Sequence, residues 1–446
     1  MRSLFVDFNS YFASVEQHEQ PALRGRPVAV APVLAETTCC IAASYEAKAY
    51  GIKTGTRVRE ARRLCPDLVI VQARPERYVR WHHILMRAID RAIPLGHVGS
   101  IDEVACELVG RQRRREVAIQ VAHQVKAEIA AAAPGDAIRC SIGIAPNAWL
   151  AKTASDMQKP DGLTVIEPGD LPGVLHGLEL RDLCGIGPSM HRRLLEHGIH
   201  SVADLTAAPK HLLHHAWGSI EGMRMWGLLR GHWLPAPKTT RASIGHSHVL
   251  GPDLRTPQAA RAVLVKLLAK AAMRMRRDQL LAGALAINIR FLGHADRWGA
   301  DLAFDPTDDS RTLLHLMDRM LRGDTRHRML PGPRHAVPLA VGVTLHKLIE
   351  RTQSSGSLFE TRTHRPGLDT VVDRINARYG LNKVYYGSMQ TALARDAAPM
   401  RIPFSHIPEK IENDAGQNPL WLKSMNQAKV LAEGEHRRLA RGRNNR

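Results

Sequence analysis

The sequence has few aromatic residues and no long hydrophobic run. Phe, Trp and Tyr make up only 5% of the 446 residues, whereas hydrophobic residues together make up 44%. The cores must therefore be built mainly from aliphatic side chains. No stretch approaches the roughly 20 consecutive apolar residues of a membrane-spanning helix, and the first residues, MRSLFVDFNS, lack a signal-peptide core. We expect a cytoplasmic protein that does not enter a membrane.

The cysteines and histidines show none of the spacings that bind zinc. The six cysteines include no CxxC pair, and the 23 histidines include no HExxH motif. In an intracellular protein such cysteines are expected to be reduced and structural. The sequence therefore assigns no metal to either residue type and predicts no disulfide.

Positive charge is in large excess. The chain has 62 Lys and Arg against 43 Asp and Glu, which gives a formal net charge of +19. Such an excess favours polyanions, because Lys and Arg release condensed counterions when they contact phosphates. Nucleic acid is the first candidate partner. An anionic membrane surface is the alternative, although nothing else in the sequence indicates a membrane.

The length predicts several domains, because 446 residues exceed one ordinary core. Strand and helix patterns alternate up to residue 166, with an inserted α+β segment that ends near residue 75. A helical region at 167–233 and a Gly/Pro-rich linker lead to a second α+β unit. From about residue 350 the pattern weakens, and the ending HRRLARGRNNR is expected to be a disordered basic tail.

Three acidic residues stand where a hard metal ion could bind. Asp7 is the one acid in the apolar run SLFVDF, and Asp102 and Glu103 stand together in a predicted strand at 98–108. Carboxylate oxygens suit Mg²⁺ rather than softer metals. Two such ions, about 3.5–4 Å apart, can promote an in-line displacement at phosphorus. If the acids meet in space, they predict phosphoryl or nucleotidyl transfer; a capping or surface role is the alternative.

Four motifs follow one another across residues 4–166: VDFNSYFASVEQ, ASYEAKAYGIKTGT, SIDE and CSIGIAPNAWLAKTASDMQKPDGL. In content, order and spacing they resemble the motifs of Y-family DNA polymerases of the DinB/UmuC type. The resemblance implies an α+β multidomain fold with the right-hand architecture of a polymerase. The implied domains are a palm at 1–18 and 76–166, fingers at 19–75, a helix-hairpin-helix thumb at 167–233, a DNA-binding little finger at 241–348, and a UmuC-like extension with a basic tail, partly disordered, at 349–446.

The resemblance also implies a metal site and its cofactor. Asp7, Asp102 and Glu103 match the family's metal-binding carboxylates, and the carbonyl of Phe8 lies beside them. Two Mg²⁺ ions are the implied cofactor. The three acids are retained, which favours catalysis over a non-catalytic relative.

Five further residues match the nucleotide site of the family. Tyr45, Lys48 and Lys159 match positions that hold the incoming deoxynucleoside triphosphate, and Lys48 replaces an Arg found in many members. That exchange replaces a bidentate fork with a point charge. Phe12 matches the steric gate, an aromatic ring that excludes a 2′-hydroxyl. The neighbouring Tyr11 is the alternative gate, and a plain core aromatic is the alternative role for Phe12.

Two regions are predicted to bind DNA. Gly185 and Gly187 precede a predicted helix, and they resemble a helix-hairpin-helix in which backbone N–H groups approach a phosphate; an ordinary turn between helices is the alternative. The predicted helix at 257–277 in the little finger carries a basic face, which we expect to contact DNA unless it is simply solvated. Its residues are Lys266, Lys270, Arg274, Arg276 and Arg277.

A segment with the sequence QSSGSLFE resembles the peptide by which polymerases bind the sliding clamp. It ends in Leu358 and Phe359. Because the preceding Ser355 and Gly356 fit that peptide less well, a plain linker is the alternative. The clamp is therefore a candidate partner, beside primer-template DNA and deoxynucleoside triphosphates.

The implied function is template-directed addition of deoxynucleotides to a primer 3′ end, with tolerance of damaged templates. Lys48 and the unusual segments PLGHVG and VACEL around SIDE depart from the family pattern. They leave a catalytically weak or inactive accessory protein, which recruits a mutagenic polymerase to DNA, as the main alternative. A purely electrostatic nucleic-acid-binding protein is a third hypothesis, but it leaves the acids in apolar strands unexplained.

Overall fold

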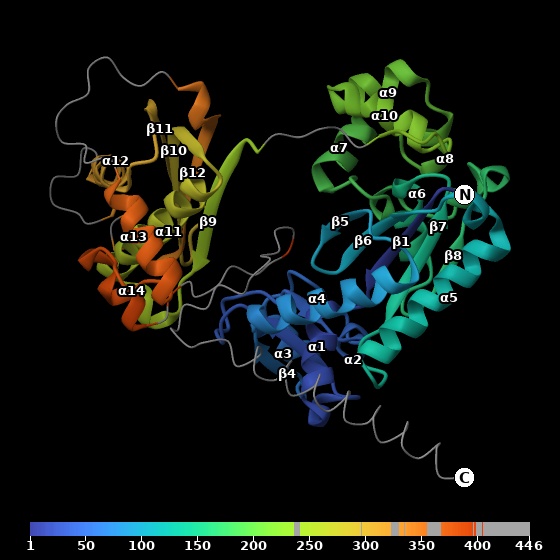
Figure 1. Ribbon diagram of the computed structural model, residues 1–446, viewed down its shortest axis with the longest axis horizontal. Coiled ribbons are helices and arrows are strands. Elements are labelled where there is room, and N and C mark those ends of the chain that lie inside the picture. The colour runs from blue at the N-terminus through green and yellow to red at the C-terminus, as the bar shows by residue number, and fades with distance from the viewer. Residues whose placement is uncertain are drawn as a thin grey trace, which may run out of the picture. The chain divides into compact units, whose positions relative to one another are not determined.

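The computed structural model describes residues 1–235, 241–295, 297–322, 330–333, 335–354, 367–395, 397 and 404 (Figure 1). These residues form two compact units. Residues 1–235 and Phe404 belong to the first unit, and the described residues from 241 to 397 form the second. Among the helices of these ranges, none is long and apolar enough to cross a membrane.

A five-stranded sheet forms the centre of the first unit, in the order β5-β6-β1-β7-β8. Strand β1 runs antiparallel to both β6 and β7, while β8 runs parallel to β7. The strands are β1 (Ser3–Phe8), β5 (His97–Ser100), β6 (Glu103–Glu107), β7 (Cys140–Ala145) and β8 (Leu163–Val165). Every residue of β1 and β7 is buried, so both faces of the sheet are covered at its centre.

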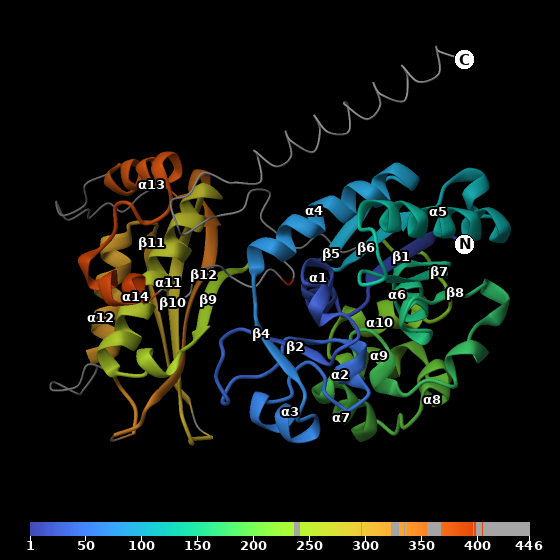
Figure 2. The ribbon, with the colours of Figure 1, turned by 90° about the horizontal axis from the view of Figure 1, so that it is seen from below.

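Helices provide that cover. Figure 2 shows α4 and α5 together on one side of the sheet and α6 on the other. The helices of this region are α1 (Tyr11–Glu19), α4 (Pro75–Ala92), α5 (Arg115–Ala132) and α6 (Ala148–Met157). Gly143 of β7 permits the close approach of α6, because a Cβ there would lie 1.9 Å from the carbonyl oxygen of Ala151.

The predicted single strand at 98–108 is wrong. The chain instead forms two antiparallel strands, β5 and β6, which are separated by Ile101 and Asp102. Local polar contacts explain the turn, because the Ser100 hydroxyl donates to the Asp102 carboxylate and the Asp102 carbonyl accepts from the Phe8 amide at 2.9 Å. Asp102 therefore lies beside the sheet rather than within a strand.

The inserted segment between α1 and α4 has its own small sheet, in the order β3-β2-β4. Its elements are β2 (Val28–Ala31), β3 (Ala42–Ala43), α2 (Tyr45–Lys48), α3 (Val58–Leu64) and β4 (Val69–Gln72). A separate apolar cluster, which includes Ala29, Ile52 and Val58, fills its interior. The Ser44 hydroxyl caps α2 by accepting from the Ala47 amide, and this fixes Tyr45 at the first position of the helix.

Four short helices follow the sheet within the first unit. They are α7 (Pro188–Glu196), α8 (Val202–Ala207), α9 (Lys210–Trp217) and α10 (Ile220–Leu228). Their buried side chains share one apolar cluster with Phe5 of β1 and Leu150 of α6. The Asn147 side chain, which caps α6, also donates to the Leu228 carbonyl at 2.9 Å. The helical region is therefore packed onto the back of α6.

The second unit is built on a four-stranded antiparallel sheet in the order β11-β10-β12-β9. The strands are β9 (Ser243–Val249), β10 (Leu280–Phe291), β11 (Arg297–Thr307) and β12 (Pro338–Glu350). Helices α11 (Pro257–Arg277) and α12 (Ser310–Arg322) lie on one face of the sheet (Figures 1 and 2). Helix α11 is confirmed at its predicted bounds, whereas edge strand β11 was not predicted.

The described residues beyond 366 form two further helices. They are α13 (Leu368–Tyr379) and α14 (Gln390–Ala394), and both contact α11. Asn376 of α13 exchanges two hydrogen bonds with the backbone of Val384, at 2.9 and 3.0 Å. This part of the C-terminal extension is therefore an ordered layer on the helical side of the second unit.

Candidate active site

Two of the predicted carboxylates lie side by side on adjacent strands of the central sheet. Asp7 of β1 and Glu103 of β6 are direct partners in the antiparallel register, so their side chains project from the same face. Alternation along β1 places Phe5 on this face too, which is the face that α6 covers. Asp7 is 3% exposed. A pair of opposed, largely buried carboxylates requires positive charge nearby.

Asp102, the third predicted carboxylate, lies next to this pair in sequence but makes different contacts. Its carboxylate accepts from Ser100, and its backbone carbonyl is tied to the amide of Phe8. Burial raises the pKa of Asp102, and the hydrogen bond from Ser100 acts in the opposite direction. The structure therefore brings Asp7, Phe8, Asp102 and Glu103 to one end of β1, as predicted.

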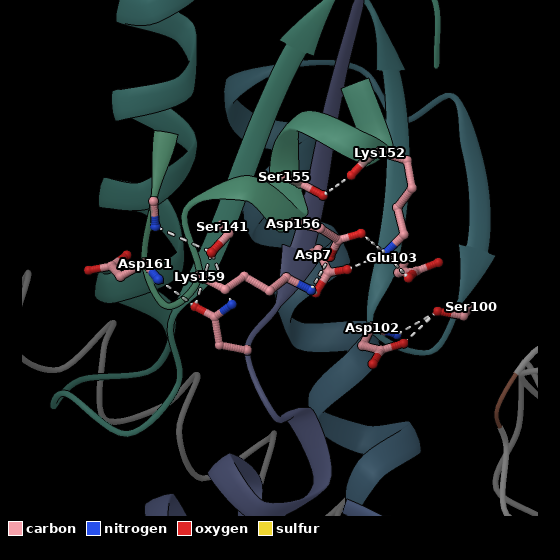
Figure 3. A network of polar contacts seen from close by, with 12 residues as sticks. Asp7, Ser100, Asp102, Glu103, Ser141, Lys152, Ser155, Asp156, Lys159 and Asp161 are labelled. Carbon is pink, nitrogen blue, oxygen red and sulfur yellow. Dashed lines mark hydrogen bonds and ion pairs between the residues drawn. The ribbon is translucent and has the colours of Figure 1, made fainter. Parts of the chain in front are cut away.

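Two lysines neutralise the carboxylates (Figure 3). Lys152 of α6 contacts both Asp7 and Glu103 through its ammonium group. Lys159 contacts the other Asp7 oxygen at 2.6 Å and Asp156 at 2.7 Å. Although burial alone would lower it, the pKa of Lys152 is raised, because the Asp7 and Asp156 carboxylates stabilise its charged form.

The donor set suits a divalent cation, but the present arrangement holds an ammonium group instead. Within the described ranges, no three His, Cys, Asp or Glu side chains are placed so that they could share one metal ion. Lys152 stands between Asp7 and Glu103, and Asp102 is turned to Ser100. The oxygen ligands that Mg²⁺ prefers are therefore present and already converge on a cation.

Sequence reasoning missed Lys152 and Asp156. They are four residues apart on α6, and their charged groups lie 3.6 Å from each other. That spacing was visible in the fourth motif, CSIGIAPNAWLAKTASDMQKPDGL. The direction in which α6 faces was not, because it depends on the packing of the helix against β1 and β7.

Asn9 and Ser141 fix the loop that carries Lys159. The Asn9 amide donates to the Ser141 hydroxyl at 3.0 Å, and its carbonyl oxygen accepts from the Asp161 amide at 2.8 Å. Ser141 also accepts from the Gly162 amide at 3.2 Å. Both side chains are buried. The two residues connect strands β1 and β7 to the loop. They therefore fix the backbone position from which the Lys159 side chain extends.

The predicted triphosphate residues lie near one another. Lys48 is positioned with its ammonium group 4.3 Å from the centre of the Tyr45 ring, on the same short helix. Burial lowers the pKa of Lys48, and the nearby charge of Lys159 lowers it further. Burial raises the pKa of Tyr45, whereas Lys159 acts in the opposite direction. Lys48, Lys159 and the Tyr45 hydroxyl therefore form one positively charged cluster beside Asp7.

Phe12 lies within an aromatic group next to the carboxylates. Its ring is stacked on Tyr78 with centroids 4.4 Å apart, and the ring of Phe404 lies 5.5 Å away. The Phe404 carbonyl accepts from the Ile101 amide at 2.7 Å. Both Phe12 and Tyr11 are buried, but Tyr11 differs because its hydroxyl donates to the Tyr78 carbonyl at 2.7 Å. Phe12 rather than Tyr11 therefore remains the predicted gate.

The predicted helix-hairpin-helix glycines are exposed on either side of buried Ile186. Gly185 has a φ of +90°, a conformation that favours glycine, and Gly187 is the N-cap of α7. No side chain in the described part of the chain caps this helix. Its first amide groups are therefore accessible to an anion.

The predicted basic face of α11 is wrong for three of its five residues. Lys266, Arg274 and Arg276 are at most 9% exposed. Lys266 donates to the Ala397 carbonyl at 2.8 Å, and Arg276 forms a bidentate pair with Asp373 of α13. The C-terminal layer covers Lys266 and Arg276, whereas the Arg274 guanidinium lies 3.4 Å from His246 Nε2 of β9. These three residues are therefore buried within the second unit rather than presented to DNA in this structure. Arg277 is exposed and Lys270 is half-buried.

The candidate clamp-binding residues Leu358 and Phe359 lie outside the described residues. The six cysteines all lie within the described residues. None of the six is joined to another, and four of them are buried.

Comparison with known proteins defines the class of the protein. Residues 6–156 match the sequence profile of the impB/mucB/samB family, and residues 241–358 match the profile of that family's C-terminal domain. The fold is similar to that of a chimeric Y-family DNA polymerase built from Dbh and Dpo4. That comparison has a TM-score of 0.65, 24% sequence identity, and coverage of 78% of this chain and all of that one. The predicted α+β multidomain polymerase fold is confirmed.

Relatives with assigned names show which polymerases of this class the chain is similar to. A protein named DNA polymerase IV from Moorella thermoacetica is 37% identical over 390 residues, which cover 84% of this chain and 93% of that protein. DNA polymerase IV 1 of Bacillus subtilis is 29% identical over 395 residues, which cover 86% of this chain and 92% of that protein. The chain belongs to the Y-family of DNA polymerases of the DinB/UmuC type. It is a DNA-directed DNA polymerase of the translesion class.

Proposed function

We propose that this polymerase adds deoxynucleotides to a primer 3′ end at Asp7, Asp102 and Glu103, with two divalent metal ions as cofactors. The observation that carries the proposal is the pairing of Asp7 with Glu103 on adjacent strands, both of them directed at a cationic group. Two Mg²⁺ ions would activate the attacking hydroxyl and stabilise the leaving phosphate. Damage bypass in repair is the proposed role, and the DNA substrate makes the cytoplasm the proposed location.

The residues around the carboxylates are suited to bind a triphosphate. Lys48 and Lys159 supply positive charge, and Tyr45 supplies a hydroxyl donor at the start of α2. A negative charge that develops on the phosphates is stabilised by donors that are already in position. Lys159 now pairs with Asp7 and Asp156, and it would exchange these contacts for phosphate oxygens. Asn9 and Ser141 would keep its loop in reach.

Phe12 is proposed to select the sugar. A ring that is supported from behind by Tyr78 cannot easily retreat from a 2′-hydroxyl, because protein interiors are close-packed. The ring of Phe404 now lies on this aromatic group. An incoming nucleotide that contacts Phe12 would displace it.

DNA is proposed to contact two surfaces. The exposed glycine turn before α7 would receive a backbone phosphate, a contact that carries no sequence information. In the second unit, the sheet face opposite α11 carries Arg290 and Arg297, which are exposed and directly opposite each other on β10 and β11. The sliding clamp remains a proposed partner through Leu358 and Phe359.

Primer extension tests the proposal. The full chain is compared with a variant that combines Asp102→Ala and Glu103→Ala, on an undamaged template and on a template with an abasic site. We expect extension on both templates by the wild type with Mg²⁺, and none by the variant. DNA binding is measured in parallel, for example by fluorescence anisotropy. Intact binding without extension by either protein would favour the accessory role instead.

A further inference from the structure

The ammonium group of Lys152 bridges two strands of the central sheet. It contacts one carboxylate oxygen of Asp7 on β1 and one of Glu103 on β6. The three side chains are 16%, 5% and 27% exposed. Like charges placed directly opposite on adjacent strands repel, and their burial increases the cost. Lys152 therefore offsets a repulsion that the backbone register builds into the sheet.

The position of Lys152 is set by the packing of α6. Asn147 caps the helix by accepting from the Leu150 amide at 2.8 Å, and Gly143 allows close contact with β7. The flexible part is only the side-chain stem, which places the ammonium group 5.3 Å from the centre of the Phe5 ring. The helix therefore delivers the charge to the carboxylates, while the stem permits it to leave.

Lys159 does not have the same role. It contacts Asp7 at 2.6 Å and Asp156 at 2.7 Å, but no contact joins it to Glu103 in the described structure. Lys152, in turn, already faces the second oxygen of Asp156 at 3.6 Å. Asp156 therefore offers Lys152 an alternative partner on the same helix.

We propose that Lys152 is an internal counter-ion, which holds Asp7 and Glu103 ready for a divalent metal ion and is displaced towards Asp156 when the ion binds. The inference rests on the metal-binding role proposed above. A metal ion held between Asp7 and Glu103 would take the position of the ammonium group, and the two positive charges would repel each other. The fold thus keeps the metal-free site compact, and the metal must compete with Lys152 for its ligands.

Calorimetric titration of the full chain with MgCl₂, without DNA or nucleotide, tests the proposal. In Lys152→Met the competitor is absent, so we expect Mg²⁺ to bind about tenfold more tightly, a change that corresponds to the loss of one substantial ion pair. In EDTA the same variant should unfold at a lower temperature than the wild type, and Mg²⁺ should restore more of its stability. Lys126→Met is the matched control, because Lys126 pairs at 2.6 Å with Asp161 outside the carboxylate group.

The Asp156→Asn variant provides a second, independent test in the same titration. It removes the partner towards which Lys152 retreats, so Mg²⁺ binding should weaken. In the double variant Lys152→Met plus Asp156→Asn, that weakening should vanish, because the two residues act through one interaction. If Lys152→Met fails to fold, the Asp156→Asn result and a Lys152→Arg variant, which keeps the charge and should not gain Mg²⁺ affinity, still decide the matter.

Three results would overturn the proposal. They are equal or weaker Mg²⁺ binding in Lys152→Met, unchanged unfolding of that variant in EDTA, and an Asp156→Asn effect that persists without Lys152. If the wild type and every variant fail to bind Mg²⁺, the metal-binding role itself is contradicted. That outcome is distinct, because it does not depend on a difference between variants.

Discussion

The rings of Phe12 and Tyr78 are stacked, with centroids 4.4 Å apart and planes inclined by 25°. Tyr78 is fixed in turn, because its hydroxyl donates to the buried carboxylate of Glu16 at 2.7 Å. Arg74 and Gln20 donate to the same carboxylate. A chain of contacts therefore runs from a buried ion pair to the residue proposed to select the sugar.

Replacement of Phe12 by Ala should relax the choice between deoxyribonucleotides and ribonucleotides. Without the ring, the ratio of their kcat/KM values should fall by about 100-fold, the scale on which a pocket excludes an added hydroxyl. Single-nucleotide insertion kinetics with both sugars measure the ratio. Tyr11→Phe is the control and should leave it unchanged, since the Tyr11 hydroxyl contacts the Tyr78 carbonyl. An unchanged ratio in Phe12→Ala would contradict the assignment of Phe12 as the gate.

Removal of the Glu16 carboxylate should destabilise the first unit strongly. Glu16 is 0% exposed, and Glu16→Ala leaves the Arg74 and Tyr78 donors without their acceptor, at a cost of about 3–5 kcal/mol. Urea unfolding monitored by circular dichroism gives the free energy of unfolding. Glu36→Ala is the matched control, because the Glu36–Arg62 pair is exposed and should contribute less than about 1 kcal/mol. Similar losses in both variants would contradict a special role for burial.

Gly143→Ala should disturb the site through the backbone. The added Cβ would lie 1.9 Å from the Ala151 carbonyl oxygen and 2.5 Å from the Ser155 amide nitrogen. Helix α6 must move to accept it, and Lys152 moves with the helix. We expect a loss of stability of about 1–3 kcal/mol and reduced primer extension. Gly169→Ala, where a Cβ meets nothing within 4 Å, should behave like the wild type.

Because His82 is buried in its neutral form, the free energy of unfolding should fall in mild acid. Burial lowers the pKa of His82 from 6.5 to about 4, and its Nδ1 lies 2.7 Å from the Ile101 carbonyl, which can only accept. Nδ1 therefore carries the proton of the neutral ring. The unfolded chain binds a further proton below about pH 6.5 and the folded chain does not, so stability is lost as the pH falls from 6.5 towards 4.

The size of this effect can be measured with a variant. Between pH 7 and 4.5 the contribution amounts to roughly 2–3 kcal/mol, at about 1.4 kcal/mol for each pKa unit. His82→Gln should lose less stability than the wild type over this range in urea unfolding. The exposed His123→Gln variant should follow the wild type. If His82→Gln loses as much stability as the wild type, the neutral ring is not the cause.

Arg276 should matter for stability and not for DNA binding. Its guanidinium pairs with Asp373 at 2.7 and 2.9 Å and donates to the Ser310 hydroxyl at 2.8 Å. Arg276→Met should therefore cost about 3–5 kcal/mol and leave the salt dependence of DNA affinity unchanged. Arg290→Met, on the open sheet face, should reduce that salt slope by about 1 if it removes one phosphate contact. A reduced slope in Arg276→Met would restore the original prediction of a DNA-facing helix.

The sequence by itself determined the elements with strong local patterns and the class of the protein. The apolar run that contains Asp7 forms β1, and the helical periodicity of α11 gave its bounds, Pro257–Arg277. Both patterns are local, because periodicity reports how one element divides between core and solvent. The order of four motifs was sufficient to indicate the family to which the chain belongs.

Only the tertiary structure decided which charges meet. Lys152 and Asp7 are 145 positions apart, and Arg276 and Asp373 are 97 apart. A basic residue on a helix looks the same in sequence whether it faces DNA, solvent or a later segment of its own chain. Docking of α13 turned Arg276 into a buried partner, and packing of α6 placed Lys152 between two strands. Such contacts depend on the relative placement of whole elements, about which a local pattern carries no information.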